Sequence, residues 1–164
     1  MFSRELLPIY LNDHLAGATL GRELARRAAG ANRGTEFGDF LTDLAAQVDA
    51  DRESLLSVMA ALEVRRDEFK VSAGWVAEKV GRFKLNGRLT SYSPLSRVFE
   101  LESLTLGVRG KLAAWRTLAG AQPNEPRLDE FDFVHLIARA EEQLAGLDAQ
   151  HARAVRQMLA EDAG

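Results

Sequence analysis

Apolar residues recur at three- and four-residue steps through nearly the whole chain, and this period limits the fold more than any other feature. It is regular between residues 37 and 62, as on one face of an α-helix. The apolar positions of that stretch are Phe37, Leu41, Leu44, Val48, Leu55, Met59 and Leu62. No stretch alternates polar and apolar residues in the manner of a half-buried strand. The period therefore predicts an all-α protein.

Turn and capping residues divide the pattern into four long helices and one shorter helix. The boundary signals are Gly30 and Gly120 as helix ends, and Thr35, Ser93-Pro94 and Asp129 as helix starts. The predicted helices cover residues 4–29, 35–64, 69–85, 94–119 and 129–160.

The lengths of the connections predict how these helices are arranged. Short connections join the first helix to the second and the third long helix to the fourth, which places each pair antiparallel. About 30 residues separate the two pairs and contain the shorter helix, 69–85. We therefore expect a four-helix bundle with one long crossover connection carrying an additional short helix, forming a single domain over residues 1–164.

Composition excludes several classes of function. The 164 residues are 46% hydrophobic and 27% charged, which is ordinary for a folded protein. Cysteine is absent, so disulfides and thiolate chemistry are excluded. The net charge of −3 argues against general affinity for nucleic acid. No apolar run approaches the length of a membrane span and no secretory signal is evident, so we expect a cytoplasmic location.

The helix order and connection lengths resemble those of the ferritin-like four-helix bundles, in which a long crossover joins the second and third helices. The resemblance covers nearly the whole chain, but it is one of architecture and not of motif. It implies a core in which carboxylates and histidines on facing helices hold two metal ions.

Several polar residues fall on the predicted inner faces. His14 lies at the centre of the apolar stripe of the first helix, and Asp51 lies between Leu44 and Leu55 on the second. The two are equally far along the chain from the predicted turn, so we expect them to be level and to form a buried pair. Pairs predicted in the same way across the last connection are Glu102 with Asp148 and Arg109 with Glu141.

These residues support two interpretations. The ferritin-like resemblance implies an iron or manganese site formed by His14, Asp51, Glu102, Glu141, Asp148 and His151, with Asp148-x-x-His151 as the counterpart of the family's Glu-x-x-His. The alternative is a set of structural ion pairs in the core, because a buried charge needs a partner. His135 lies away from the inner face and is expected on the surface.

A second candidate site lies in the crossover. Lys79, Arg82, Lys84, Arg88 and Arg97 occur there without an acidic residue among them. Such a cluster could hold an anion or a nucleic-acid backbone. The alternative is a solvated connection whose charges balance those of nearby helices, and binding of nucleic acid is the less favoured interpretation.

The remaining signals concern packing and assembly. Gly17-x-x-x-Gly21 predicts a close approach of two helices inside the bundle. Ile9 and Leu20 lie off the inner stripe, and Leu106 widens the apolar arc of its helix, so we expect a homodimer. No motif names a reaction, and the sequence favours a structural or interaction protein, with a divergent metalloprotein as the alternative.

Overall fold

A computed structural model describes residues 5–67 and 92–161 of the chain. Within these ranges the helices are α1 (Leu6–Ala31), α2 (Gly38–Ala61), α4 (Pro94–Ala121) and α5 (Phe133–Glu161), with 3-10 turns η1 (Gln122–Asn124) and η2 (Pro126–Leu128) between the last two. No strand occurs in the described ranges. The predicted all-α four-helix bundle is confirmed, whereas the predicted helix at 69–85 lies outside the described residues.

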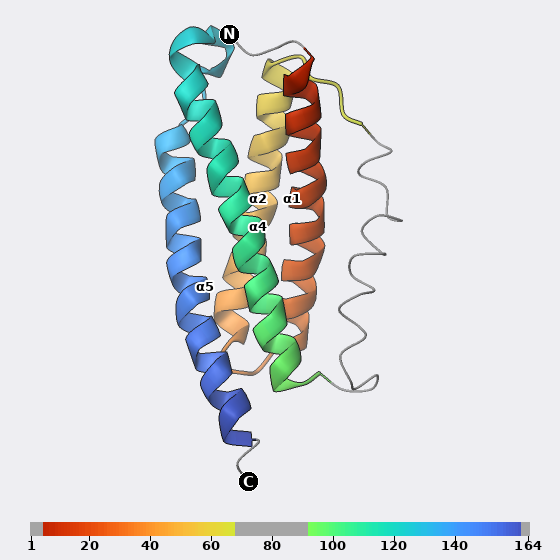
Figure 1. Cartoon of the computed structure of the whole chain (residues 1–164), viewed down its shortest axis with the longest axis vertical. Helices are drawn as coiled ribbons and strands as arrows, with labels where there is room; N and C mark the ends of the chain where they lie inside the picture. Colours follow the sequence, from red (N-terminus) through yellow and green to blue (C-terminus); the bar gives the residue numbers. More distant parts are fainter. Residues whose placement is uncertain (1–4, 68–91, 162–164) are drawn as a thin grey trace.

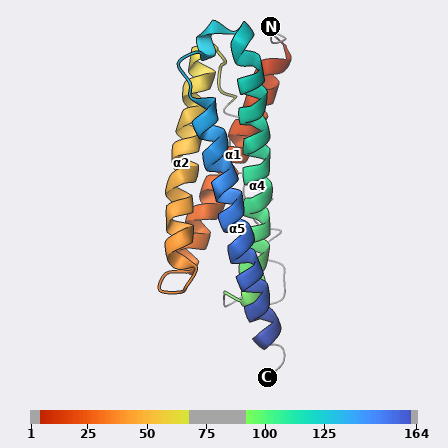
Figure 2. The same ribbon diagram turned by 90° about the vertical axis from the view of Figure 1, so that its left-hand side faces the viewer.

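The four helices form one elongated bundle (Figure 1). α1 packs most extensively against α2, and α4 against α5, as the short connections require. α1 also lies along α4, while α2 makes fewer contacts with α5. The helices therefore follow one another around the bundle in the order α1, α2, α5, α4, which Figure 2 shows from the side of α5. α2 and α4 run in the same direction, which is the arrangement that the predicted crossover requires.

One apolar core runs between the helices and receives side chains from all four. Its largest fully buried members are Trp115 of α4, Phe133 at the start of α5 and Phe37 just before α2. Leucines at helical spacing fill most of the rest, and burying each such side chain contributes about 1.5–3 kcal/mol.

The helix boundaries differ from the predicted ones by amounts that affect the pairing of residues. Ser93 caps α4 as predicted, accepting a hydrogen bond from the backbone N–H of Ser96 at 3.1 Å. Asp129 does not cap α5: the cap is Asp132, whose carboxylate accepts from the N–H of His135 at 2.9 Å. α1 ends at Ala31 instead of residue 29, and α2 begins at Gly38 instead of 35. Each turn is thereby displaced along the chain, and the facing residues change by about one helical turn.

The start of α2 leads to a first prediction. A Cβ added at Gly38 would lie 2.7 Å from the backbone oxygen of Asn32, so the turn between α1 and α2 would have to move. We expect Gly38→Ala to lower the free energy of unfolding by about 1–3 kcal/mol in urea denaturation. Gly30→Ala is the matched control: its Cβ meets open space, and it should stabilise by up to about 1 kcal/mol. Equal effects of the two substitutions would contradict this close contact.

Candidate functional site

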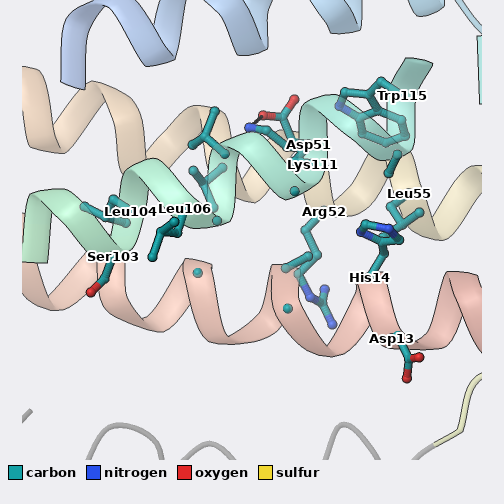
Figure 3. Close-up of a pocket in the computed structure, with 18 residues that line it drawn as sticks. Asp13, His14, Asp51, Arg52, Leu55, Ser103, Leu104, Leu106, Lys111 and Trp115 are labelled. Atoms are coloured by element: carbon teal, nitrogen blue, oxygen red, sulfur yellow. Dashed lines mark hydrogen bonds and ion pairs between the residues drawn. The ribbon is translucent and has the colours of Figure 1, made fainter. Parts of the chain in front are cut away.

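The structure does not pair His14 with Asp51. Because the turn between α1 and α2 is displaced, His14 lies near Leu55, one turn further along α2 (Figure 3). Its ring makes an edge-on contact with Tyr10, with 4.5 Å between ring centroids. Burial lowers the pKa of His14 below its usual value, and the charge of Asp13 only partly opposes this. At neutral pH His14 therefore carries a neutral imidazole, and the predicted ion pair is wrong.

Asp51 instead lies in a polar network between α2, α4 and α5. Its side chain is 2% exposed and forms ion pairs with Lys111 and Arg139. Gln143 accepts a hydrogen bond from Lys111 and donates to both Asp51 and Gln47. A buried carboxylate requires such partners, so the interpretation of Asp51 as half of a core ion pair holds with different partners.

The predicted pairs across the α4–α5 connection are only partly present. His151 Nε2 lies 3.1 Å from a carboxylate oxygen of Glu102, and both side chains are well exposed. Asp148 is also exposed and makes no such contact among the described residues. Glu141 pairs with Arg116 at 2.7 Å and not with Arg109. α5 begins at Phe133 and not at residue 129, which accounts for the changed partners.

The six candidate metal ligands therefore do not converge. In the described ranges no three histidine, cysteine, aspartate or glutamate side chains lie together as a metal site would require. Asp51 is bound by two cations inside the bundle, whereas Glu102 and His151 lie on its surface. His135 is exposed, as predicted.

Of the predicted anion site, only Arg97 is described, since Lys79, Arg82, Lys84 and Arg88 lie outside the described residues. The guanidinium of Arg97 lies 4.4 Å from the ring centroid of Phe37 and donates to Asn32 at 2.7 Å and to Gln157 at 3.0 Å. Arg97 thus joins α4 to the turn after α1 and to α5. These contacts account for the position of the Arg97 side chain, and no bound anion is needed to explain it.

Tyr92 belongs to the same network and leads to a second prediction. Its hydroxyl accepts from Asn32 at 2.7 Å and donates to Glu100 at 2.8 Å. Burial, assisted by the charge of Glu100, raises the pKa of Tyr92 to about 12, although Asn32 and Arg97 act in the opposite direction. A raised pKa in the folded state contributes stability that is complete below pH ~10 and is lost as the pH rises through about 12.

We therefore expect the free energy of unfolding to fall between pH ~10 and about 12 more steeply in the wild type than in Tyr92→Phe. Urea denaturation across this range measures both curves. The other groups that titrate in this range are the same in both proteins, so the difference between the curves isolates Tyr92. Parallel curves would mean that the pKa of Tyr92 is the same in the folded and the unfolded chain, which would contradict the prediction.

A cavity of about 200 Å³ lies between α1, α2 and α4 (Figure 3). Its inner wall is formed by buried residues and its mouth, between α1 and α4, by exposed ones such as Gly17, Leu106 and Gly107. The lining residues are Asp13, His14, Gly17, Ala18, Gly21, Val48, Asp51, Arg52, Leu55, Ser103, Leu104, Leu106, Gly107, Val108, Gly110, Lys111, Ala114 and Trp115. The wall is mainly apolar, and its charged members are Asp13, Asp51, Arg52 and Lys111. A cavity of roughly 150 Å³ is sufficient to hold benzene.

Glycines form much of the two walls at the mouth. Gly17 and Gly21 come from α1, and Gly107 and Gly110 come from α4. A Cβ added at any of the four would meet no atom within 4 Å. The prediction that Gly17-x-x-x-Gly21 serves a close approach of helices is therefore wrong, because these glycines border open space. A glycine inside a helix lowers the stability of that helix by about 0.5–1 kcal/mol relative to alanine. Close packing does not explain why glycine occupies these four positions.

Trp115 forms part of the inner wall and carries an unsatisfied donor. Its side chain is 2% exposed, and its indole N–H has no hydrogen-bond partner among the described residues. In Figure 3 the nitrogen-bearing edge of the ring faces the side of Asp51 and Lys111. A buried donor without a partner costs about 1–3 kcal/mol. An acceptor that reached this N–H would remove that cost.

Sequence reasoning singled out His14, Gly17, Gly21, Asp51 and Leu106, although not as members of a cavity, and it missed Lys111, Trp115 and the α4 glycines. Gly107-x-x-Gly110 was the available signal, since two glycines inside a long predicted helix are unfavourable without a local reason.

Comparison with known proteins adds no assignment. No protein-family model matches the chain, and neither a curated protein nor a solved structure is significantly similar to it. The resemblance to ferritin-like bundles therefore stays a prediction from helix order. Among the described residues, no helix is both long enough and apolar enough to cross a membrane.

Proposed function

We propose that this protein binds a small, mainly apolar molecule in the cavity between α1, α2 and α4. The observation that carries the proposal is the combination of an open volume of about 200 Å³ with a buried, unpaired indole N–H in its wall. The apolar wall would take the body of the ligand, and Trp115 would fix the orientation of its polar end. Ligand sites usually combine an apolar wall with a few polar groups that orient the ligand.

The size of the cavity limits the ligand. Sites for drug-sized molecules have volumes of about 300–1,000 Å³, whereas this cavity is smaller. A single ring or a short alkyl chain with one polar substituent matches the available space. The facing glycines leave the mouth open where side chains would otherwise close it.

A titration with benzene, followed in ¹H–¹⁵N NMR spectra, tests the proposal. We expect saturable shifts for the amides of Gly21 of α1 and Gly110 of α4, which both line the cavity. The amide of Gly30, on α1 but outside the cavity, should not move. Absence of saturable shifts, or shifts confined to residues away from the cavity, would contradict the proposal.

Self-association is a second proposal, favoured by large apolar side chains on the surface. Leu106 is 72% exposed and Ile9 52% exposed, although burial of either would be favourable. A homodimer would cover such positions. Light scattering at micromolar concentration tests it, and a monodisperse monomer would contradict it.

A further inference from the structure

The donors that remain unused beside the cavity specify the polar end of its ligand more closely. A lysine ammonium has three N–H donors. In the described part of the chain, Lys111 uses two of them, on Asp51 and on Gln143. The third is unused, and so is the indole N–H of Trp115. Lys111 and Trp115 lie one turn apart on α4, and both line the cavity.

The carboxylate of Asp51 is already engaged, and Ser103 has no proton left to donate to a ligand. Both oxygens of Asp51 receive hydrogen bonds, from Lys111, Arg139 and Gln143. The hydroxyl of Ser103 donates to the backbone oxygen of Phe99 at 2.8 Å. The cavity therefore offers unused donors, which a ligand satisfies with acceptor atoms.

The charges around Asp51 decide between a neutral and an anionic acceptor. Lys111 and Arg139 form their ion pairs with Asp51 alone among the described residues, so two partly buried cations, 16% and 21% exposed, share one buried carboxylate. Gln47 and Gln143, which complete the network, carry no charge. Arg52, the other cation of the wall, is already paired with Glu53 at 2.9 Å. An excess cation away from water is unfavourable, and an anion beside it offsets that cost.

We infer that the ligand is a small monocarboxylate whose two oxygens accept hydrogen bonds from Trp115 Nε1 and from the ammonium of Lys111. Its apolar body, an aromatic ring or a short alkyl chain, lies along the apolar wall toward the glycine-lined mouth. This inference rests on the proposed function and names the ligand class for the same cavity. Burial lowers the pKa of Lys111, although Asp51 opposes this, and a bound carboxylate would raise that pKa again.

Calorimetric titrations with matched pairs of an acid and its amide test the inference in the wild-type protein. The probes are benzoate with benzamide and hexanoate with hexanamide. We expect the carboxylate of at least one pair to bind about tenfold or more tightly than the amide of the same shape, because charge-assisted hydrogen bonds are the stronger ones. Trp115→Phe keeps an aromatic ring but removes the donor, and should weaken binding of the carboxylate by about three- to tenfold.

Lys111→Met provides the sharpest variant, because it removes the cation and keeps a long apolar side chain. The preference for carboxylate over amide should disappear in this variant. Arg116→Met is the matched control, with the same change of charge on the same helix, at an exposed residue that pairs with Glu141 outside the cavity. It should retain the preference. The comparison of acid and amide in the wild type does not depend on whether Lys111→Met folds.

The outcomes separate this inference from the proposed function. Amides that bind as tightly as their carboxylates would overturn the anionic ligand and leave a ligand-binding cavity. A preference that persists in Lys111→Met would overturn the role of Lys111. Failure of every probe to bind, acid or amide, would overturn the monocarboxylate together with the proposed function.

Discussion

Replacing Asp51 with alanine is expected to lower the free energy of unfolding by about 3–5 kcal/mol, the cost of leaving buried charges without their partner. Asp51 is the carboxylate that Lys111 and Arg139 share inside the bundle. Its removal leaves both partly buried cations near each other and without their shared counter-charge. Urea denaturation at neutral pH measures the effect.

Asp49→Ala is the matched control for this prediction. Asp49 lies two residues earlier on α2 and also contacts two cations, Arg22 and Arg26, but all three side chains are partly solvated. Its loss should cost at most about 1 kcal/mol. The triple variant Asp51→Leu, Lys111→Met, Arg139→Met should recover most of the stability, because it removes the charges together. A small effect of Asp51→Ala, or no recovery in the triple variant, would show that the network does not act through buried charge.

Filling the cavity is expected to abolish ligand binding without unfolding the protein. In the double variant Gly21→Leu, Gly110→Leu, two side chains enter the open volume from α1 and α4. We expect the affinity for benzene, or for a probe that binds more tightly, to fall by at least about 100-fold, or roughly 2.8 kcal/mol. Stability should be unchanged or higher, because leucine has a better helix propensity than glycine. NMR titration and urea denaturation measure the two effects.

Gly30→Leu controls for the substitution itself. Gly30 is a helical glycine of α1 whose Cβ also meets open space, but it does not line the cavity. It should bind the probe as the wild type does. Undiminished binding by the double variant would place the binding site elsewhere in the molecule. A strong loss of stability in the double variant would show that the glycines do serve packing.

The class of fold could be predicted from the sequence because it depends on a period repeated over many residues. The pairing of individual residues could not, because it depends on where each helix ends. Both Asp129 and Asp132 are suitable caps by residue type, and only the packing of Phe133 into the core decides between them. That choice moves every residue of α5 relative to α4. The same effect at the α1–α2 turn separated His14 from Asp51.

The cavity was harder to predict than the ion pairs. Helical spacing predicted Glu102 opposite Asp148, three residues from its actual partner His151, because charged side chains on facing helices carry their own signal. A cavity forms where side chains do not fill the space between helices, so no residue type marks it in the sequence. A glycine inside a helix is compatible with close packing as well as with open space. Trp115 has the spacing of an ordinary core residue, and only the structure shows that its N–H has no partner in residues 5–67 and 92–161.

The most direct test of a ligand in this cavity is the indole N–H resonance of Trp115, followed by ¹H–¹⁵N NMR during a titration with benzoate. The chain has two tryptophans, so two indole signals are expected, and Trp115→Phe identifies the relevant one by its loss. The account predicts a saturable downfield shift of that signal, as its proton gains an acceptor. A Trp115 signal that stays in place at saturating benzoate, while the protein remains folded, would contradict it.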